Sequence, residues 1–348
     1  MVTALASDLD EILEESADDL RSLRGTRVLV TGASGFVGRW LTETLTWAHD
    51  RMDLGLRLEL LCRNPGALGR RLVSHPCVRL TAADVRTLAP EALGHVDAVI
   101  HTATAASAAL NAQRPTEMID TIVDGTRRVL AVARHSGSVP FLFTSSGAVY
   151  GPLPPTIEAV AEDYRGGPDP LDPGYAYHEA KRMAELLCSI AAREHATAVK
   201  VARLFAFVGP HLPIDAHFAV GNFMRDRIGG QPINVLGDGT TVRSYLYAGD
   251  MTAWLLAVLV RGETARAYNV GSQEAVAIES LAEMVAASGP DGPVPVRVAR
   301  VAAPGAPVDR YVPSTERIRT ELGVRERVGL DEGLARTLAW HRRGTASS

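Results

Sequence analysis

The sequence lacks the marks of several large classes of protein. Only three of its 348 residues are cysteines, an odd number without paired spacing, so it predicts neither a disulfide framework nor a zinc or other metal site. Lys and Arg number 36 against 40 Asp and Glu, for a net charge of -4. Because no positive excess is available to neutralise a phosphate backbone, we expect no nucleic-acid partner.

Long apolar runs and excesses of Gly or Pro are missing as well. No segment reaches the length of about 18 apolar residues that a membrane-spanning helix needs. Where a secretory signal has a basic start and an apolar run, the chain carries acids: Asp8, Asp10, Glu11, Glu14 and Glu15. We therefore expect a cytoplasmic protein with no membrane partner. The 31 Gly and 20 Pro are too few for a low-complexity chain, and the length predicts about two globular domains.

Strand and helix patterns alternate from residue 27 onward. Strands are predicted at 27–31, 56–62, 78–81, 98–101, 141–145 and 198–205, and helices at 36–50, 115–136 and 175–194. This alternation predicts an α/β fold with a doubly wound, Rossmann-type parallel sheet. The later residues mix short strands, turns and helices, which predicts a smaller C-terminal lobe facing the substrate.

Two segments stand apart from this alternation. Residues 8–24 place apolar residues at nearly helical spacing, with acids on the other face, which predicts a short amphipathic helix that docks or lies at a dimer edge. Residues 152–173 are rich in proline and too long for an ordinary connection. We expect this loop to cover part of a site.

Three glycines, Gly32, Gly35 and Gly38, follow the first strand and open the first helix with G-x-x-G-x-x-G spacing. Glycine permits a tight turn and the close approach of a pyrophosphate, which then lies at the positive end of the helix. We predict a dinucleotide site at this turn, and we include Phe36 and Val37 in it.

The end of the second strand indicates which dinucleotide binds. An acid there suits a free ribose 2'-hydroxyl and an arginine suits a 2'-phosphate. The chain offers Arg63 and no acid in LLCRN, so NADP(H) is favoured and NAD(H) is the alternative. Asp84 and Val85, after the third strand, are placed to contact the adenine.

A phenol, an ammonium group and a hydroxyl form the predicted reaction site. Tyr177 and Lys181 are four residues apart on one helix face, and Ser146 ends the fifth strand, at the edge where a parallel sheet binds its ligands. A tyrosine with a pKa of about 10 is a poor base at neutral pH, but Lys181 and a positive nicotinamide ring favour its phenolate. Tyr177 is then able to exchange a proton with an alcohol or carbonyl oxygen that Ser146 also contacts.

This combination resembles the extended short-chain dehydrogenase/reductase superfamily, in particular the NAD-dependent epimerase/dehydratase family that acts on nucleotide sugars. The resemblance spans residues 27 to 322. The matching segments are 31–38 (TGASGFVG), 84–85 (DV), 101–103 (HTA), 125–126 (GT), 145–151 (SSGAVYG), Tyr177 with Lys181, 208–210 (VGP), 237–239 (GDG), Asp250 and 269–271 (NVG).

The resemblance implies roles for these residues. Tyr177 is implied as acid and base, Lys181 as the residue that binds the nicotinamide ribose and lowers the tyrosine pKa, and Ser146 as the group that positions the reacting oxygen. Thr102 and Ala103 are implied in cofactor binding. The residues implied to contact the substrate's nucleotide diphosphate are Asn222, Arg243 and Arg310.

The resemblance also implies an organisation. We divide the chain into an N-terminal helical extension at 1–25, an NAD(P)-binding Rossmann domain at 26–205 with returning segments near 240–272, and a mainly substrate-binding lobe at 206–345. Relatives commonly form homodimers through two helices of each subunit, here those at 115–136 and 175–194.

Positions at which the chain differs from the family pattern narrow the range of reactions that we expect it to catalyse. Nucleotide-sugar 4,6-dehydratases carry Asp and Glu at the positions of Gly147 and Ala148, and UDP-glucuronate decarboxylases keep Glu at the second, so both reactions lose support. Where many relatives have Asn before the VGP segment the chain reads FAF at 205–207, and Ser244 replaces a frequent Asp. We expect an altered sugar pocket.

With dehydration and decarboxylation disfavoured, the reaction that we expect is hydride transfer at the 4-position of the sugar. An NADPH-dependent reductase of a nucleotide-linked 4-keto-6-deoxyhexose needs only Ser146, Tyr177 and Lys181 and agrees with Arg63, so we favour it. A nucleotide-sugar 4-epimerase uses the same three residues but holds NAD tightly. A non-sugar carbonyl reductase and a non-catalytic cofactor-sensing protein are further alternatives.

Overall fold

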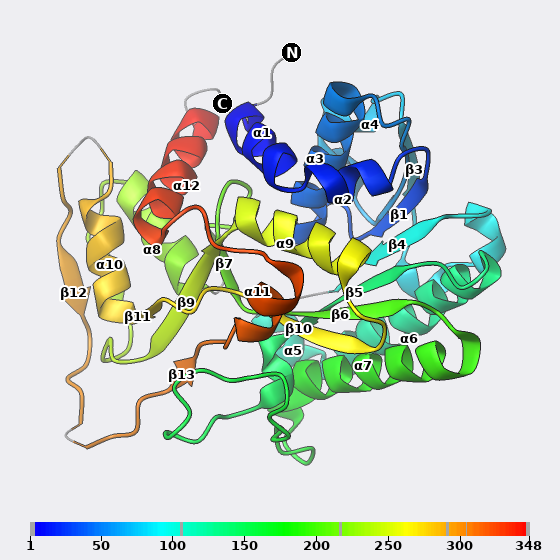
Figure 1. Ribbon diagram of the computed structural model, residues 1–348. Coiled ribbons are helices and arrows are strands. Elements are labelled where there is room, and N and C mark those ends of the chain that lie inside the picture. Colours follow the sequence, from blue (N-terminus) through cyan, green and yellow to red (C-terminus); the bar gives the residue numbers. More distant parts are fainter. Residues whose placement is uncertain (1–3, 105–106, 216–217, 290–291, 304, 346–348) are drawn as a thin grey trace.

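The structure is a computed structural model that describes residues 4–104, 107–215, 218–289, 292–303 and 305–345. A seven-stranded sheet with helices on both faces forms its larger part, and a smaller lobe lies at one edge (Figure 1). The predicted α/β fold with a Rossmann-type doubly wound parallel sheet is confirmed.

The strands of the main sheet are all parallel and lie in the order β10-β6-β5-β4-β1-β2-β3. The apolar runs of β1, β2, β4 and β5 are buried on both faces, as is typical of a parallel sheet, while the edge strand β3 is only partly buried. The order reverses between β1 and β4, and ligands bind at such reversals. The bounds are β1 Arg27–Thr31, β2 Arg57–Cys62, β3 Val78–Ala82, β4 Ala98–His101, β5 Phe141–Ser146, β6 Val199–Leu204 and β10 Arg266–Val270.

Two layers of helices cover the sheet. Helices α6 (Pro115–His135) and α7 (Ala176–His195) pack on one face, and α3 (Phe36–Met52) and α9 (Ala248–Arg261) on the other (Figure 1). Helix α9 is buried from Ala248 to Leu259 because further helices cover its outer side. Each face of the sheet therefore has its own apolar core.

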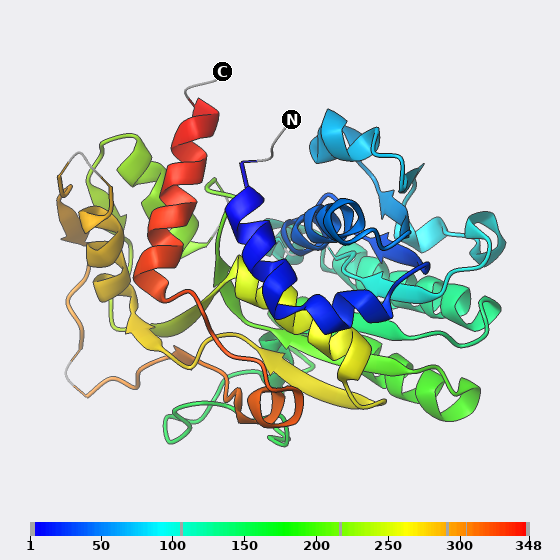
Figure 2. The ribbon, with the colours of Figure 1, turned by 45° about the horizontal axis from the view of Figure 1, so that its top comes forward.

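The N-terminal segment forms two helices, α1 (Ala6–Glu15) and α2 (Ala17–Ser22), where the sequence predicted one. The backbone of Ser16 leaves the helical conformation between them, and this bend lets both apolar faces follow α9. Leu9 and Leu20 are completely buried. The segment thus packs on its own chain, beside the C-terminal helix α12 (Leu330–Thr345) (Figure 2).

The smaller lobe is built around β9 (Val242–Tyr247), which pairs with β7, β11 and β13. Strand β6 of the main sheet leads into β7 of the lobe, β9 leads into α9, and β10 returns to the main sheet beside β6 before the chain enters the lobe again at β11. The remaining strands and helices of the lobe are β7 Ala206–Val208, α8 Ala219–Ile228, β8 Ile233–Val235, β11 Ala275–Ala277, α10 Ile278–Ala287, β12 Val296–Val298, β13 Arg310–Tyr311 and α11 Glu316–Leu322.

Short helices fill the connections of the main sheet. They are η1 Pro65–Leu68, α4 Arg70–Val73, η2 Val85–Thr87, η3 Pro90–Leu93, α5 Ala108–Gln113, η4 Gly147–Tyr150 and η5 Pro173–Tyr175. Across the described ranges, every helix is too short or too polar to cross a membrane.

Candidate active site

The glycine turn between β1 and α3 is closely packed. Gly32 has a φ of +69°, and a Cβ there would lie 2.7 Å from the backbone nitrogen of Ala103. Gly35 is the N-cap of α3, which has no side-chain cap and no acid in its first turn. An uncapped helix start with free positive character fits the phosphates of a dinucleotide.

The other predicted cofactor residues follow the carboxyl ends of β2, β3 and β4. The Thr102 hydroxyl donates to the carbonyl of Thr31 at 2.6 Å, which fixes the end of β4 beside the turn. Arg63 is exposed directly after β2. Asp84 pairs with Arg86 at 2.8 Å, and this contact lowers the pKa of its carboxyl group, while Val85 is buried next to it.

Ser146, Tyr177 and Lys181 converge at the carboxyl end of β5. The Ser146 side chain lies close enough to the Tyr177 phenol to act on its pKa, and the Lys181 ammonium lies 5.9 Å from the Tyr177 ring centre. Lys181 donates to the carbonyl oxygen of Thr144 at 2.8 Å. The backbone N–H of Ala148 donates to the Ser146 Oγ at 3.1 Å, so both hydroxyl and ammonium are held in place.

Burial sets the charges of this group. It lowers the pKa of Lys181 to about 7, while Glu185 one helical turn further acts to raise it. Burial raises the pKa of the Tyr177 phenol, and the nearby Ser146 side chain lowers it by less. Tyr177 is therefore protonated at neutral pH and suited to donate a proton.

Glu185 belongs to a buried polar network behind the site. Arg203 holds its two carboxylate oxygens at 3.0 and 2.7 Å, and the Ser145 hydroxyl donates to it at 2.6 Å. A bidentate pair of this kind is rigid. The negative charge is thereby fixed four residues from Lys181.

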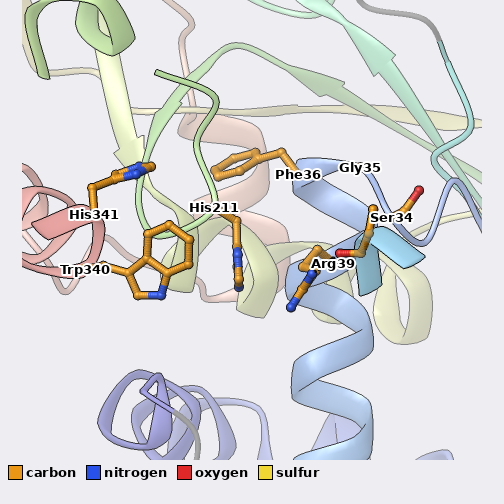
Figure 3. A pocket seen from close by; sticks show the side chains of 8 residues that line it. Ser34, Gly35, Phe36, Arg39, His211, Trp340 and His341 are labelled. Carbon is orange, nitrogen blue, oxygen red and sulfur yellow. Dashed lines mark hydrogen bonds between the residues drawn. The ribbon is translucent and has the colours of Figure 1, made fainter. Parts of the chain in front are cut away.

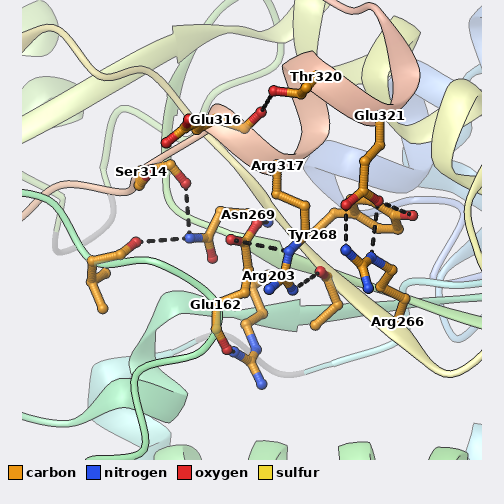
Figure 4. A network of polar contacts seen from close by, with 12 residues as sticks. Glu162, Arg203, Arg266, Tyr268, Asn269, Ser314, Glu316, Arg317, Thr320 and Glu321 are labelled. Carbon is orange, nitrogen blue, oxygen red and sulfur yellow. Dashed lines mark hydrogen bonds and ion pairs between the residues drawn. The ribbon is translucent and has the colours of Figure 1, made fainter.

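The same network continues through Asn269 on β10 (Figure 4). The Asn269 side chain donates to the carbonyls of Val160 and Ser314 at 2.9 and 3.0 Å, and the Tyr150 hydroxyl donates to Asn269 at 2.7 Å. Val160 lies in the proline-rich loop, so the amide of Asn269 fastens this loop to the sheet. The loop thus has a fixed position beside the site.

Tyr311 on β13 enters the site from the smaller lobe. Its phenol donates to the carbonyl oxygen of Leu204 at 3.5 Å, the nearby Ser146 acts to lower its pKa, and its ring packs on Phe205 with ring centres 4.6 Å apart. The sequence analysis missed Tyr311 because it is far along the chain from Ser146 and no local motif includes it. Glu185 was missed too, although its i, i+4 spacing from Lys181 was a usable signal.

The predicted substrate residues lie in the smaller lobe. Arg243 on β9 pairs with Asp309 at 2.6 Å, and its guanidinium lies 5.8 Å from the Tyr311 ring centre. Arg310 is the neighbour of Tyr311 on β13. Asn222 on α8 accepts a hydrogen bond from its own helix. The structure thus brings Arg243 next to the reaction site through Tyr311.

A cavity of about 240 Å³ borders the glycine turn (Figure 3). Arg39, which lines the cavity, pairs with Glu43, and Arg71 pairs with the same side chain. Two guanidinium groups therefore share one carboxylate. His211 packs against Trp340, and burial and nearby cations lower its pKa to about 3. The cavity lining is Ser34, Gly35, Phe36, Arg39, Ala67, His211, Trp340 and His341.

Similarity to known proteins agrees with this geometry. Residues 28–271 match the profile of the NAD dependent epimerase/dehydratase family. The chain belongs to this family. The family resemblance predicted from the sequence is confirmed, and the protein is an enzyme of a group that uses nicotinamide dinucleotides.

Individual members of this family illustrate the range of reactions. UDP-glucuronic acid decarboxylase 6 of Arabidopsis thaliana is 30% identical over 259 residues, 74% of this chain and 73% of the relative. The solved structure of a DesIV double mutant, a dTDP-glucose 4,6-dehydratase from Streptomyces venezuelae with NAD bound, is 25% identical with a TM-score of 0.77, covering 92% of this chain and 98% of that one. The fold is also that of UDP-glucose 4-epimerase from Thermotoga maritima, with 22% identity, a TM-score of 0.76 and coverage of 92% and 99%.

Proposed function

We propose that this enzyme uses NADPH to reduce a nucleotide-linked 4-keto-6-deoxyhexose. The observation that carries the proposal is the convergence of Ser146, Tyr177 and Lys181 beside Gly147 and Ala148, which bear no acid or base. Reduction of a ketone needs one proton donor at the reacting oxygen. The chain supplies that donor and no second one at these positions.

The catalytic residues act on one oxygen atom. A bound NADPH supplies the hydride. Tyr177 donates its proton to the carbonyl oxygen as the carbon is reduced, and Ser146 donates a hydrogen bond to the same oxygen. Lys181 in its charged form stabilises the phenolate that remains, and the fixed charge of Glu185 opposes the loss of the Lys181 proton that burial favours.

The space beside Gly147 argues against dehydration and decarboxylation. A Cβ at this position would lie 2.6 Å from the Phe205 ring and 2.7 Å from the Tyr311 hydroxyl. These side chains occupy the volume that an acidic residue at 147 would need. Together with Ala148, this packing supports a reaction that uses Tyr177 alone for proton transfer.

We assign the substrate's diphosphate to Arg243, Asn222 and Arg310. The guanidinium fork donates charge-assisted hydrogen bonds that suit phosphate oxygens. Arg243 has the strongest support, because it lies against Tyr311 and so close to the reacting oxygen. The sugar then extends from the smaller lobe toward Ser146.

We also assign the cofactor as NADP(H). Arg63 follows β2 where the adenosine ribose is expected, and Asp84, the nearby carboxylate, is engaged by Arg86. Arg39 lines the cavity beside the glycine turn, and it and Arg71 together outweigh the one negative charge of Glu43 with which both pair. A 2'-phosphate has favourable partners there.

Homodimerisation through α6 and α7 completes the proposal. These helices leave Ile119, Met183 and Leu186 exposed by 39, 45 and 53%. Apolar side chains at this exposure on two adjacent helices suit a bundle with a second copy.

The test of the reaction uses the purified enzyme with nucleotide-linked sugars. We expect NADPH oxidation with a 4-keto-6-deoxyhexose substrate, no carbon dioxide from UDP-glucuronate, and no dinucleotide released when the purified protein is denatured. Near-stoichiometric NAD in the denatured protein, with interconversion of 4-epimers and no net NADPH oxidation, would establish an epimerase instead.

A charge reversal tests the cofactor assignment. We expect Arg63→Glu to weaken NADPH binding by at least about tenfold, since one charge-assisted contact is lost, and to leave NADH binding nearly unchanged. Arg57→Glu is the matched control, because Arg57 is exposed at the opposite end of the same strand. An unchanged preference in Arg63→Glu would remove Arg63 from the cofactor site.

A further inference from the structure

The first turn of α7 carries Tyr177 and is not capped by the helix's own N-cap residue. Tyr175, which holds that position, makes no capping hydrogen bond through its side chain. The first four backbone N–H groups of a helix have no acceptor within the helix, and the N–H of Tyr177, the second residue of α7, is one of them. An acceptor for this N–H has to come from outside the helix.

Asn111 on α5 supplies this acceptor. Its side-chain oxygen accepts a hydrogen bond from the backbone N–H of Tyr177 at 2.9 Å, and its side-chain nitrogen donates to the carbonyl oxygen of Gly174 at 2.7 Å. Only one orientation of the amide satisfies both contacts, because a flipped amide would place donor against donor and acceptor against acceptor. One side chain thus joins the turn before α7 to the helix itself.

Helix α5 gives Asn111 a fixed place. The backbone N–H of Leu110 donates to the hydroxyl of Ser107, the N-cap of α5, at 3.2 Å. The N–H of Arg114 donates to the carbonyl oxygen of Leu110 at 2.8 Å, where α5 passes into α6. Helix α5 also packs against α6 and η5. The half-buried Asn111 therefore belongs to the connection that follows β4, which begins against the glycine turn.

The other two reacting groups are held from elsewhere. Lys181 lies one turn further into α7 and donates to the carbonyl oxygen of Thr144 on β5 at 2.8 Å, and Ser146 ends the same strand. A movement of the first turn of α7 would therefore shift Tyr177 relative to both groups. A displacement of a catalytic group by about 1 Å is enough to lower a rate about a hundredfold.

A purely structural helix cap is the competing explanation. Such a cap would stabilise α7 and leave the geometry of the site unchanged. The other end of α7 offers a comparison, because the Ser138 hydroxyl donates to the carbonyl oxygen of His195, the last residue of the helix, at 2.6 Å. Both contacts join a side chain from another segment to the backbone of α7, and of these two only that of Asn111 reaches the residue assigned to proton transfer.

We propose that Asn111 is a positioning residue that fixes the first turn of α7 and so places the Tyr177 phenol at the reacting oxygen. The inference rests on the proposed function only in that Tyr177 exchanges a proton with the substrate, and it holds for reduction and epimerisation alike. It also gives α5 a use, since the connection after β4 borders the glycine turn at one end and holds the proton donor at the other.

Amide hydrogen exchange tests the contact without a substrate. In Asn111→Ala we expect the backbone N–H of Tyr177 to exchange at least about tenfold faster than in the wild type, because its acceptor is removed. Ser138→Ala is the matched control and should leave this rate unchanged. Equal exchange at Tyr177 in Asn111→Ala and in the wild type would contradict the inference.

Steady-state kinetics tests the positioning. Asn111→Ala should lower kcat by at least about tenfold, with KM for the sugar and the affinity for NADPH within about twofold of wild type, while Ser138→Ala should keep wild-type kcat. In a Tyr177→Phe background, Asn111→Ala should lower the remaining turnover no further, because the group that it positions is gone. An unchanged kcat in Asn111→Ala, an equal loss in Ser138→Ala, or the same loss without the Tyr177 hydroxyl would overturn the inference.

The proposed function and the role of Asn111 fail separately. A wild-type enzyme that oxidises NADPH with none of the 4-keto-6-deoxyhexose substrates counts against the proposed function, while the exchange rate at Tyr177 still tests Asn111. Wild-type turnover that is indifferent to Asn111 counts against Asn111 alone.

Discussion

At the scale of single residues, burial determines which groups carry charge in the site. Lys181 is 2% exposed, and Tyr177 beside it is half-buried. Each loses solvation when ionised, so the neutral forms are favoured, and the charge on Lys181 depends on Glu185. Tyr177 therefore keeps its proton at neutral pH, and Lys181, whose pKa is about 7, gains its charge more readily when an anion forms beside it.

Removal of the Tyr177 hydroxyl tests the proton transfer. We expect Tyr177→Phe to lower kcat by at least about a thousandfold, toward the upper range for loss of a general acid, with NADPH affinity within about twofold of wild type. Steady-state kinetics and fluorescence titration with NADPH measure the two effects. Turnover close to wild type would exclude Tyr177 as the proton donor.

His101 offers a prediction for stability against pH. The ring is completely enclosed between Thr31 at 2.7 Å and Thr126 at 3.2 Å, and burial lowers its pKa from 6.5 to about 3. Because the folded pKa is depressed, the unfolded chain takes up a proton between about pH 6.5 and 3 that the folded chain does not, so stability falls as the pH falls through this window.

The histidine is expected to contribute about 2 kcal/mol to the loss of unfolding free energy between about pH 7 and pH 5. His101→Asn should show a pH-dependent loss smaller by that amount, as measured by urea unfolding at both pH values. The comparison uses the difference between the two pH values, so a constant destabilisation of the variant cancels. An identical loss in both proteins would contradict the buried, neutral state of His101.

At the scale of helices and strands, the sequence predicts the elements of the first half of the chain but not those of the second half. The predicted strands of the main sheet agree with the structure to within one or two residues through β5, because long apolar runs signal them. The predicted strand at 198–205 ends at Leu204. The strands around β9 are short and gain their pairing from partners distant in sequence, so no local pattern specified them.

The residues of the candidate site likewise fall into those that the sequence predicts and those that only the structure reveals. Ser146, Tyr177 and Lys181 were predicted from motifs on neighbouring elements, and the structure brings them together. Tyr311 and the lining residue His211 come from the smaller lobe, and only the tertiary fold places them near the others. The bend at Ser16 was missed for a related reason, because packing on α9 imposes it.

The N-terminal helices are expected to stabilise the fold without taking part in the reaction. Leu9 on α1 is completely buried, so Leu9→Ala should lower the free energy of unfolding by about 2–5 kcal/mol and leave kcat and KM unchanged. Chemical denaturation and steady-state kinetics measure both. Leu171→Ala, at a site 89% exposed, is the control, and equal stability of the two variants would contradict the packing of α1.

At the scale of the whole molecule, the larger lobe offers Ser146, Tyr177 and Lys181, and the smaller lobe offers Tyr311 and Arg243. The domain boundaries near residues 25 and 206 stay a prediction. Strands β9 and β10 connect the lobes on either side of α9. Groups from both lobes therefore meet at the carboxyl end of β5, one strand away from the reversal of the strand order.

The proposed dimer is tested on α7. Leu186→Arg places a charge on the exposed apolar face of α6 and α7, so we expect monomers in sedimentation velocity where the wild type is dimeric. Leu236→Arg is the control, because Leu236 is exposed by 79% outside these helices, and it should remain dimeric. A monomeric wild type, or dimers of Leu186→Arg, would contradict this interface.

The proposed transfer of hydride to carbon 4 of the sugar is open to direct measurement. The enzyme is incubated with a nucleotide-linked 4-keto-6-deoxyhexose and NADPH that carries deuterium at its transferable position, and the product is examined by NMR. We predict one deuterium on carbon 4 for each NADPH oxidised. Deuterium that stays on NADPH while the sugar is epimerised, dehydrated or decarboxylated would contradict the proposed reductase.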